Sequence, residues 1–185
     1  MNSKSFLKRF RKDIKDKREY QKALLFLFLF IFCFSIFYLI LSISQISNYI
    51  SYFYGLLSSI CLTVFFGINN QFVFDAVSKT SSIVVSTISE PITIGFLCSG
   101  VLEFCLLASA MIASVGISIK KRLMGVLISI PVIVIFNVFR ITVTSYIIVA
   151  GNLSFANLVH GFLFRIFLIA MVIGTYFVWF KEVYK

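Results

Sequence analysis

The chain has 185 residues, of which 60% are hydrophobic and 13% are charged, and its mean hydropathy is +1.02. This composition excludes a soluble domain with a polar surface and predicts a protein surrounded by membrane lipids. The net charge of +10 does not indicate a nucleic-acid partner, because 9 of the 17 basic residues precede the first apolar run.

The basic segment at residues 1–22 is expected to lie in the cytoplasm, as a short amphipathic helix on the inner leaflet. The apolar run at 23–43 follows it directly, so the positive-inside rule starts this first span in the cytoplasm. The run is as long as a full span and no small-residue cleavage site follows, so we interpret it as a retained helix and not as a signal peptide.

A second apolar helix is predicted at 49–67. It carries small and polar residues at helical spacing, namely Ser51, Gly55, Ser58, Ser59 and Thr63. This stripe predicts packing against another helix, and it is also a hypothetical wall for an apolar substrate tail. The region 69–94 changes to β-branched and aromatic residues, and predicts short strands outside the hydrocarbon at 72–75, 82–88 and 92–94.

Three further spans are predicted. The third begins near Phe96 and ends at the basic cluster 120–122, the fourth covers 123–150, and the fifth covers 158–180 after a polar turn at 151–157. A short basic tail, 181–185, ends the chain. The predicted fold is therefore an all-α polytopic membrane protein with about five membrane helices, a short β-like extracytoplasmic segment near 70–95, and one membrane-embedded domain at 23–180.

The basic clusters leave a conflict in the topology. They place 120–122 and the C-terminus in the cytoplasm, so the strand segment must lie outside. If both early helices cross fully from a cytoplasmic N-terminus, that segment lies inside instead. Either the 49–67 helix lies in or re-enters from the outer leaflet, or the N-terminus is outside, or 72–95 hides another crossing; we favour the first alternative.

The four cysteines do not indicate a metal site or a disulfide framework. Cys33, Cys61, Cys98 and Cys105 lie in apolar stretches with neither CxxC spacing nor neighbouring histidines, so we expect no metal and no cofactor. A glycosylation sequon begins at Asn152, but such triplets often arise by chance and we expect it to be unused.

Three reactive side chains are predicted to share one depth in the bilayer. Cys98 lies 22 residues from Lys120, Arg140 lies 18 from Arg122, and His160 lies 21 from Lys181. With the rise of an α-helix these separations correspond to ~33, ~27 and ~31 Å, so all three reach the outer boundary of the hydrocarbon core. The same count places Glu103 and Arg165 about one turn deeper.

Each of these residues has a structural interpretation beside the functional one. Cys98 is a small hydrophobe or a thiolate favoured at the start of a helix by Ser99-Gly100. His160 bonds a loop carbonyl or acts as the acid and base for the thiol. Arg140 snorkels to headgroups or stabilises an oxyanion.

Supporting residues are expected around these three. Asn137 precedes Arg140 by three residues and shares its helix face. For Glu103 and Arg165 we favour an interhelical ion pair that fixes helix register below the site.

These residues together resemble the conserved core of the archaeosortase/exosortase family. The similarity extends over residues 50–180, and its most specific parts are the Cys98-Ser99-Gly100 motif, Asn137-Val138-Phe139-Arg140 and His160-Gly161. Bacterial members often carry arginine shortly after the first motif, where this chain has Val101-Leu102-Glu103. The resemblance is therefore to a compact archaeosortase.

The resemblance implies a multi-pass plasma-membrane cysteine peptidase or transpeptidase with an outward-facing site. Its substrates would be secreted surface proteins with a C-terminal hydrophobic helix and a basic tail, and a lipid or other amine or hydroxyl would accept the product. By position, Cys98 would be the nucleophile, Arg140 the oxyanion or substrate stabiliser, and His160 the general acid and base. Some members have arginine in place of the histidine, and Arg165 is a less well placed candidate for that role.

Two functions of other classes are the alternatives: a non-catalytic membrane subunit, or a small transporter, in which the intramembrane charges fix helix packing. The sequence shows no inverted repeat and no polar path across the bilayer, which disfavours the transporter. It does not specify the sorting motif, the acceptor, the source organism or the oligomeric state.

Overall fold

The computed structural model describes residues 3–75, 77–78 and 80–183, with side chains from residue 17 onward except those of 44 and 97. Residues 1–2 of the predicted basic segment and 184–185 of the predicted tail lie outside the described residues. The fold is helical with one small sheet, as predicted. Four of its helical segments are long and apolar enough to cross a membrane, namely Lys17–Ser42, Gln45–Phe66, Ile119–Val149 and Leu153–Val183.

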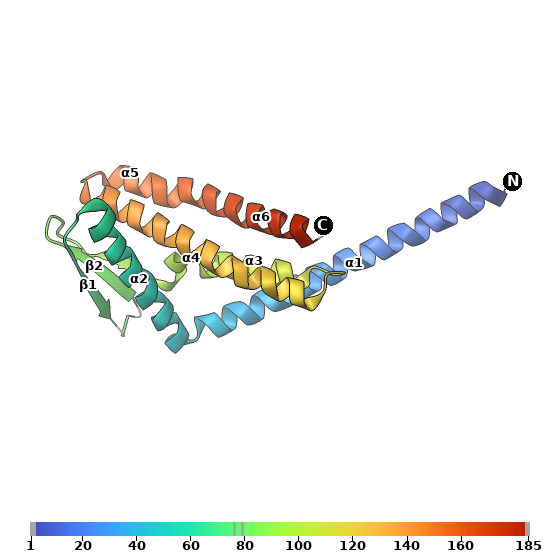
Figure 1. Ribbon diagram of the computed structural model, residues 1–185, viewed down its shortest axis with the longest axis horizontal. Coiled ribbons are helices and arrows are strands. Elements are labelled where there is room, and N and C mark those ends of the chain that lie inside the picture. Colours follow the sequence, from blue (N-terminus) through green and yellow to red (C-terminus); the bar gives the residue numbers. More distant parts are fainter. Residues whose placement is uncertain (1–2, 76, 79, 184–185) are drawn as a thin grey trace.

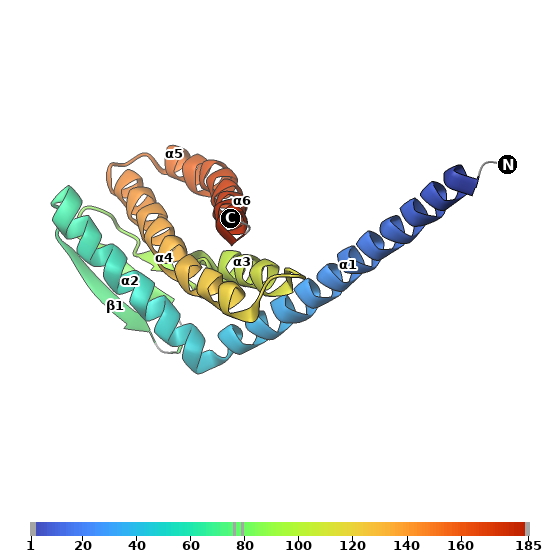
Figure 2. The ribbon, with the colours of Figure 1, turned by 45° about the vertical axis from the view of Figure 1, so that its right-hand side comes forward.

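The first helix, α1 (Ser3–Ser42), is continuous through the basic segment, which does not form a separate amphipathic helix. After a bend at Ile43 the chain enters α2 (Ser44–Phe66). In both ribbon views α2 leads away from α1 and does not fold back beside it (Figures 1 and 2).

The strands predicted between 70 and 95 form a three-stranded antiparallel sheet. Its strands are β1 (Asn70–Asp75), β2 (Thr80–Val85) and β3 (Ile92–Ile94), in the order β1-β2-β3. Alternate residues of β2 are buried, as expected for a strand with one covered face. In the turn after β1, Asp75 accepts hydrogen bonds from the hydroxyl of Ser78 and the backbone N–H groups of Val77 and Ser78, which hold the pKa of its carboxyl below the ordinary value.

The small-residue stripe of α2 packs on this sheet. Ser81 of β2 donates to the carbonyl of Ser51 at 2.7 Å, and an added Cβ at Gly55 would overlap the Ser81 side chain. Ser51 and Ser58 are fully buried. The stripe is therefore covered from Ser51 to Ser59 and exposed only at Thr63, and the hypothesis that it forms a wall for substrate is wrong.

The third predicted span is shorter than expected. A 3₁₀ turn, η1 (Phe96–Ser99), leads into α3 (Val101–Ala113), whose 13 residues extend over ~20 Å. Residues 114–118 are not helical, and the basic cluster 120–122 belongs to the first turn of α4 (Ile119–Val149). Arg122 donates to the carbonyls of Ile112 and Ile117 at 2.8 Å each, so it satisfies backbone acceptors where α3 ends.

The last span begins earlier than predicted. Asn152 caps the short helix α5 (Leu153–Leu158) by accepting from the N–H of Phe155 at 3.0 Å, so the polar turn is confined to a few residues. A π-helical segment, η2 (Val159–Leu163), joins α5 to α6 (Phe164–Val183).

The bundle has two distinct ends. The sheet and α5 lie at one end, and the C-terminus lies at the other (Figure 1). At the C-terminal end Trp179 of α6 donates to the carbonyl of Lys121, and Lys121 donates to the carbonyl of Val183 at 2.9 Å. The basic cluster 120–122 therefore lies opposite the sheet. One buried cluster fills each end: Tyr54, Leu62, Ile83, Val85, Ile94 and Ile141 beside the sheet, and Leu107, Met111, Ile117, Ile133 and Trp179 beside the basic cluster.

Candidate functional site

Cys98 lies in the turn that joins the sheet to α3. Its N–H donates to the carbonyl of Gly95 at 2.9 Å, and its side chain is half-buried. Two residues later Gly100 has φ +73°, and α3 begins at Val101. The thiol-bearing residue therefore stands just before the N-terminal end of a helix, where unpaired N–H groups and the helix dipole favour negative charge.

The position of this turn depends on a close contact between Gly100 and Asn137. Asn137 is fully buried on α4 and donates to the carbonyl of Ile133 at 2.9 Å. An added Cβ at Gly100 would overlap the Asn137 amide group. The glycine is thus required both by the positive φ and by the approach of α4, and Asn137 supports the site from behind the turn.

We expect Gly100→Ala to destabilise the protein by about 2–4 kcal/mol, because it combines a left-handed backbone conformation with overpacking. Thermal unfolding in detergent measures this change. Gly174→Ala is the matched control, since nothing lies within 4 Å of a Cβ at that position. In an Asn137→Ala background, Gly100→Ala should cost less stability, because the overlap with the amide is gone. If Gly100→Ala costs the same in both backgrounds, the contact between Gly100 and Asn137 does not contribute.

Arg140 of α4 is bound directly to the cysteine turn. Its side chain is 6% exposed, and its Nη2 donates to the backbone carbonyl of Cys98 at 2.8 Å. Its Nε is buried and has no hydrogen-bond partner in the described part of the chain. One nitrogen of the guanidinium thus holds the turn, while Nε is left without a partner among the described residues.

His160 lies in the π-helical segment η2, at the same end of the bundle as the sheet. Its ring is half-buried and its Nδ1 is buried without a hydrogen-bond partner. The structural interpretation of His160 required a hydrogen bond from this ring to a loop carbonyl. Within the described residues the ring makes no such bond. Single-turn π segments are frequent at functional sites.

Glu103 and Arg165 face the same cavity, but they do not form the predicted ion pair in the part of the chain that the structure describes. Glu103 Oε2 is buried and has no hydrogen-bond partner. Arg165 is exposed on α6. The prediction of a separate register-fixing pair is therefore wrong, and Glu103 and Arg165 instead line one cavity together with Arg140.

One cavity of about 560 Å³ brings the predicted residues together. Five side chains with chemical function line it: Cys98 and Glu103 from η1 and α3, Arg140 from α4, His160 from η2 and Arg165 from α6. The rest of the lining is aliphatic and consists of Leu102, Leu106, Leu168, Ile169, Val172 and Ile173. Ser99 is buried and donates to the carbonyl of Phe96, and neither it nor Asn137 lines this cavity.

The other cysteines lie away from this cavity. Cys105 is completely buried in α3, and Cys33 and Cys61 are half-buried on α1 and α2. Among the residues described, no cluster of three or more His, Cys, Asp and Glu side chains is placed to hold a metal ion.

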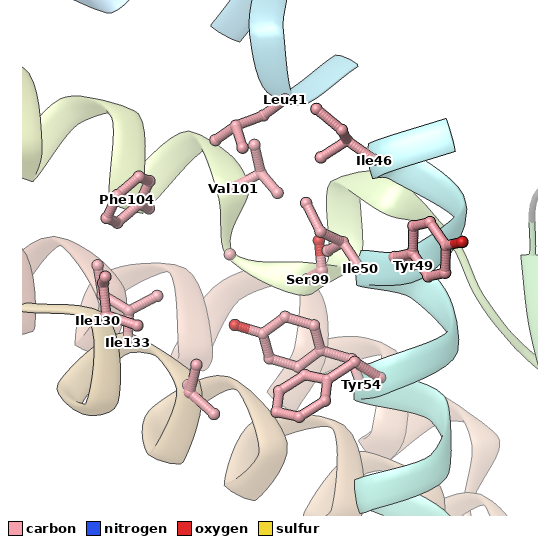
Figure 3. A pocket seen from close by; sticks show the side chains of 13 residues that line it. Leu41, Ile46, Tyr49, Ile50, Tyr54, Ser99, Val101, Phe104, Ile130 and Ile133 are labelled. Atoms are coloured by element: carbon pink, nitrogen blue, oxygen red, sulfur yellow. The ribbon is translucent and has the colours of Figure 1, made fainter. Parts of the chain in front are cut away.

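A second, apolar cavity of about 390 Å³ adjoins the cysteine turn (Figure 3). Ser99 and Gly100 line it, and the hydroxyl of Tyr54 from α2 points into it (Figure 3). Tyr54 thus lies next to the cysteine turn without lining the candidate cavity, and its sequence position among apolar residues gave no signal of this.

No protein-family model, curated protein or solved structure matches the chain. The candidate site therefore rests on its own geometry: a thiol at a helix N-terminus, a guanidinium with a free buried donor, and an imidazole with a free buried nitrogen, all on one cavity. These groups are able to supply a nucleophile, an oxyanion donor and a proton carrier.

Proposed function

We propose that this protein is a membrane-embedded cysteine peptidase or transpeptidase. The observation that supports this best is the convergence of Cys98, Arg140 and His160, from three separate elements, on one cavity. A purely structural arginine would use its donors on the protein, whereas Arg140 uses Nη2 on the Cys98 carbonyl and keeps Nε unpaired.

In the proposed reaction the Cys98 thiolate attacks a substrate carbonyl, and a C–S bond forms. The negative charge that develops on the carbonyl oxygen is stabilised by Arg140, whose guanidinium cannot serve as a base at neutral pH. His160 carries the proton from the thiol to the leaving amine as the C–N bond breaks, which leaves a thioester on Cys98.

An acceptor then completes the reaction. Water, or the amine or hydroxyl of another molecule, attacks the thioester and gives its proton to His160 while the C–S bond breaks and the thiolate is restored. In the described part of the chain no hydrogen bond joins the Cys98 thiol to the His160 imidazole. The substrate amide would lie between the two groups, and catalytic hydrogen bonds often form only in the complex with substrate.

The proposed location is the plasma membrane, with the site facing outward. Support comes from the basic cluster 120–122, which lies at the end opposite the sheet and which the positive-inside rule assigns to the cytoplasm. The resemblance of the Cys98, Arg140 and His160 motifs to archaeosortases adds the proposed substrate class, secreted surface proteins with a C-terminal hydrophobic helix and basic tail, and a lipid as one acceptor.

Trapping the thioester tests this function. Membranes of cells that produce the chain are quenched in acid, and the peptide that contains Cys98 is sought by mass spectrometry with an acyl group that hydroxylamine removes. The acyl group should occur on Cys98 and be absent from Cys61 and Cys105, which serve as internal controls. A non-catalytic subunit or a transporter would carry no such group, and a Cys98 that is always free while secreted proteins are still processed would exclude the proposal.

A further inference from the structure

Among the described residues, Glu103 is the only acidic side chain that lines the candidate cavity. It follows Cys98 by five residues, in the first turn of α3, and it is half-buried. In the part of the chain that the structure describes it forms no ion pair, and its Oε2 is buried without a hydrogen-bond partner. An acidic group inside a membrane protein is costly, so one that lacks a structural partner is a candidate for a functional role.

The polar groups of this cavity divide into donors and a single acceptor group. Arg140 and Arg165 offer N–H donors only, whereas the carboxylate of Glu103 offers acceptors only. Nε of Arg140 and Oε2 of Glu103 both lack a partner among the described residues, so they do not satisfy each other. A bound group that complements both side chains has to accept a hydrogen bond from one and donate a hydrogen bond to the other.

One residue of an extended polypeptide carries this pair of groups on one side. In a β-strand the N–H and the C=O of the same residue point in the same direction, which is why two paired residues of antiparallel strands exchange both hydrogen bonds. A proline has the carbonyl but lacks the N–H. Arg140 and Glu103 together are therefore complementary to one extended residue that is not proline.

We propose that Glu103 accepts the backbone N–H of the substrate residue whose carbonyl Cys98 attacks, while Arg140 donates to the carbonyl oxygen of that residue. The nitrogen on the other side of the carbonyl receives its proton from His160 in the proposed reaction, so it is not the partner of Glu103. Glu103 is thus a substrate-binding residue that orients the carbonyl and excludes proline at this position. The inference deepens the proposed function and rests on it, because it names what the site requires of the substrate.

A pair of small alkylating reagents tests this contact without turnover. The probes are N-acetyl-leucine chloromethyl ketone and its N-methyl analogue, which differ in one backbone N–H. When Cys98 reacts with either probe a C–S bond forms, chloride leaves and the thiol proton passes to the buffer. The full chain is reconstituted in phospholipid vesicles, and the rate of Cys98 alkylation is followed by mass spectrometry. Iodoacetamide is the comparison reagent for the reactivity of the thiol itself.

The unchanged protein should react at least about tenfold faster with the N–H probe than with the N-methyl probe, because a hydrogen bond to a charged group contributes at least this factor. In Glu103→Leu the two rates should lie within about twofold of each other. Glu103→Gln keeps an acceptor oxygen and should retain part of the preference. Leu102→Ala is the matched control, since Leu102 lines the same cavity, and it should keep the full preference. Iodoacetamide should react within about twofold in all four proteins.

The contact would be overturned by equal rates of the two probes in the unchanged protein, or by a preference that persists in Glu103→Leu, which would be steric. It would also be overturned by equal loss in Leu102→Ala, or by a preference in Glu103→Gln no larger than in Glu103→Leu. Alkylation requires neither C–N cleavage nor a thioester. A preference that depends on Glu103 without any thioester would therefore retain the contact and remove the peptidase, whereas a thioester without this preference would do the reverse.

Discussion

Replacement of Cys98 by alanine is expected to reduce substrate processing by at least about 10³-fold, because the nucleophile of a covalent mechanism has no substitute in the cavity. The measurement compares the C-terminal peptides of membrane and secreted proteins in cells that produce the unchanged chain, Cys98→Ala, or no chain. Precursors that keep their apolar C-terminal segment should accumulate equally in the last two.

The control is Cys61→Ala, since Cys61 is another half-buried thiol of the membrane region but does not line the cavity. It should process precursors at the normal rate. Both variants should insert in membranes at equal amounts and unfold within a few degrees of the parent, because each change removes only one sulfur atom. Normal processing by Cys98→Ala would remove the peptidase hypothesis, and equal loss in both variants would point to a structural defect.

The grouping of Cys98, Arg140 and His160 was predictable because helix rise converts sequence separation into depth. Charges at the membrane boundary supply the reference points for depth. Ionisable residues at similar depths are costly to expose to lipid, so they are expected to face the same interior of the bundle. The structure brings all three to one cavity. Depth alone does not specify which faces of the helices meet. The sequence therefore predicted that the three residues lie near one another, but it did not predict their contacts.

One premise of that depth argument was wrong. The count for Cys98 assumed an unbroken helix to residue 120, but α3 ends at Ala113 and 114–118 are not helical. The break carries no charged residue, and its local signal is only the alternation of Ser114, Gly116 and Ser118 with apolar residues. Two backbone carbonyls near this break, those of Ile112 and Ile117, accept from the side chain of Arg122.

The contacts of Glu103 and Tyr54 also depend on tertiary structure. Opposite charges at similar depth predicted a Glu103–Arg165 ion pair, but the two side chains line a wider cavity with Arg140 instead. Tyr54 lines the neighbouring cavity from α2, whose small-residue stripe packs on the sheet. The stripe was visible in the sequence, whereas its partner was not, since a small residue permits close approach by a strand as readily as by a helix.

Replacement of Arg140 by lysine is expected to lower kcat for a precursor about 10²- to 10³-fold, with a much smaller change in KM. Lysine keeps the positive charge near Glu103 but has one nitrogen in place of a planar fork. It is therefore able to hold the Cys98 carbonyl or to meet the oxyanion, but not both, whereas Arg140 has Nη2 for the first and Nε for the second.

A second substitution separates chemistry from folding. Arg140→Met removes the charge and the bond to the Cys98 carbonyl, so it should also lower the free energy of unfolding by about 1.5–3 kcal/mol, the usual contribution of a hydrogen bond to a charged group. Arg140→Lys should unfold close to the parent temperature. Arg165→Lys is the matched control, because Arg165 lines the same cavity from an exposed position. If Arg165→Lys lost more activity than Arg140→Lys, the oxyanion donor would be assigned to α6 and not to α4.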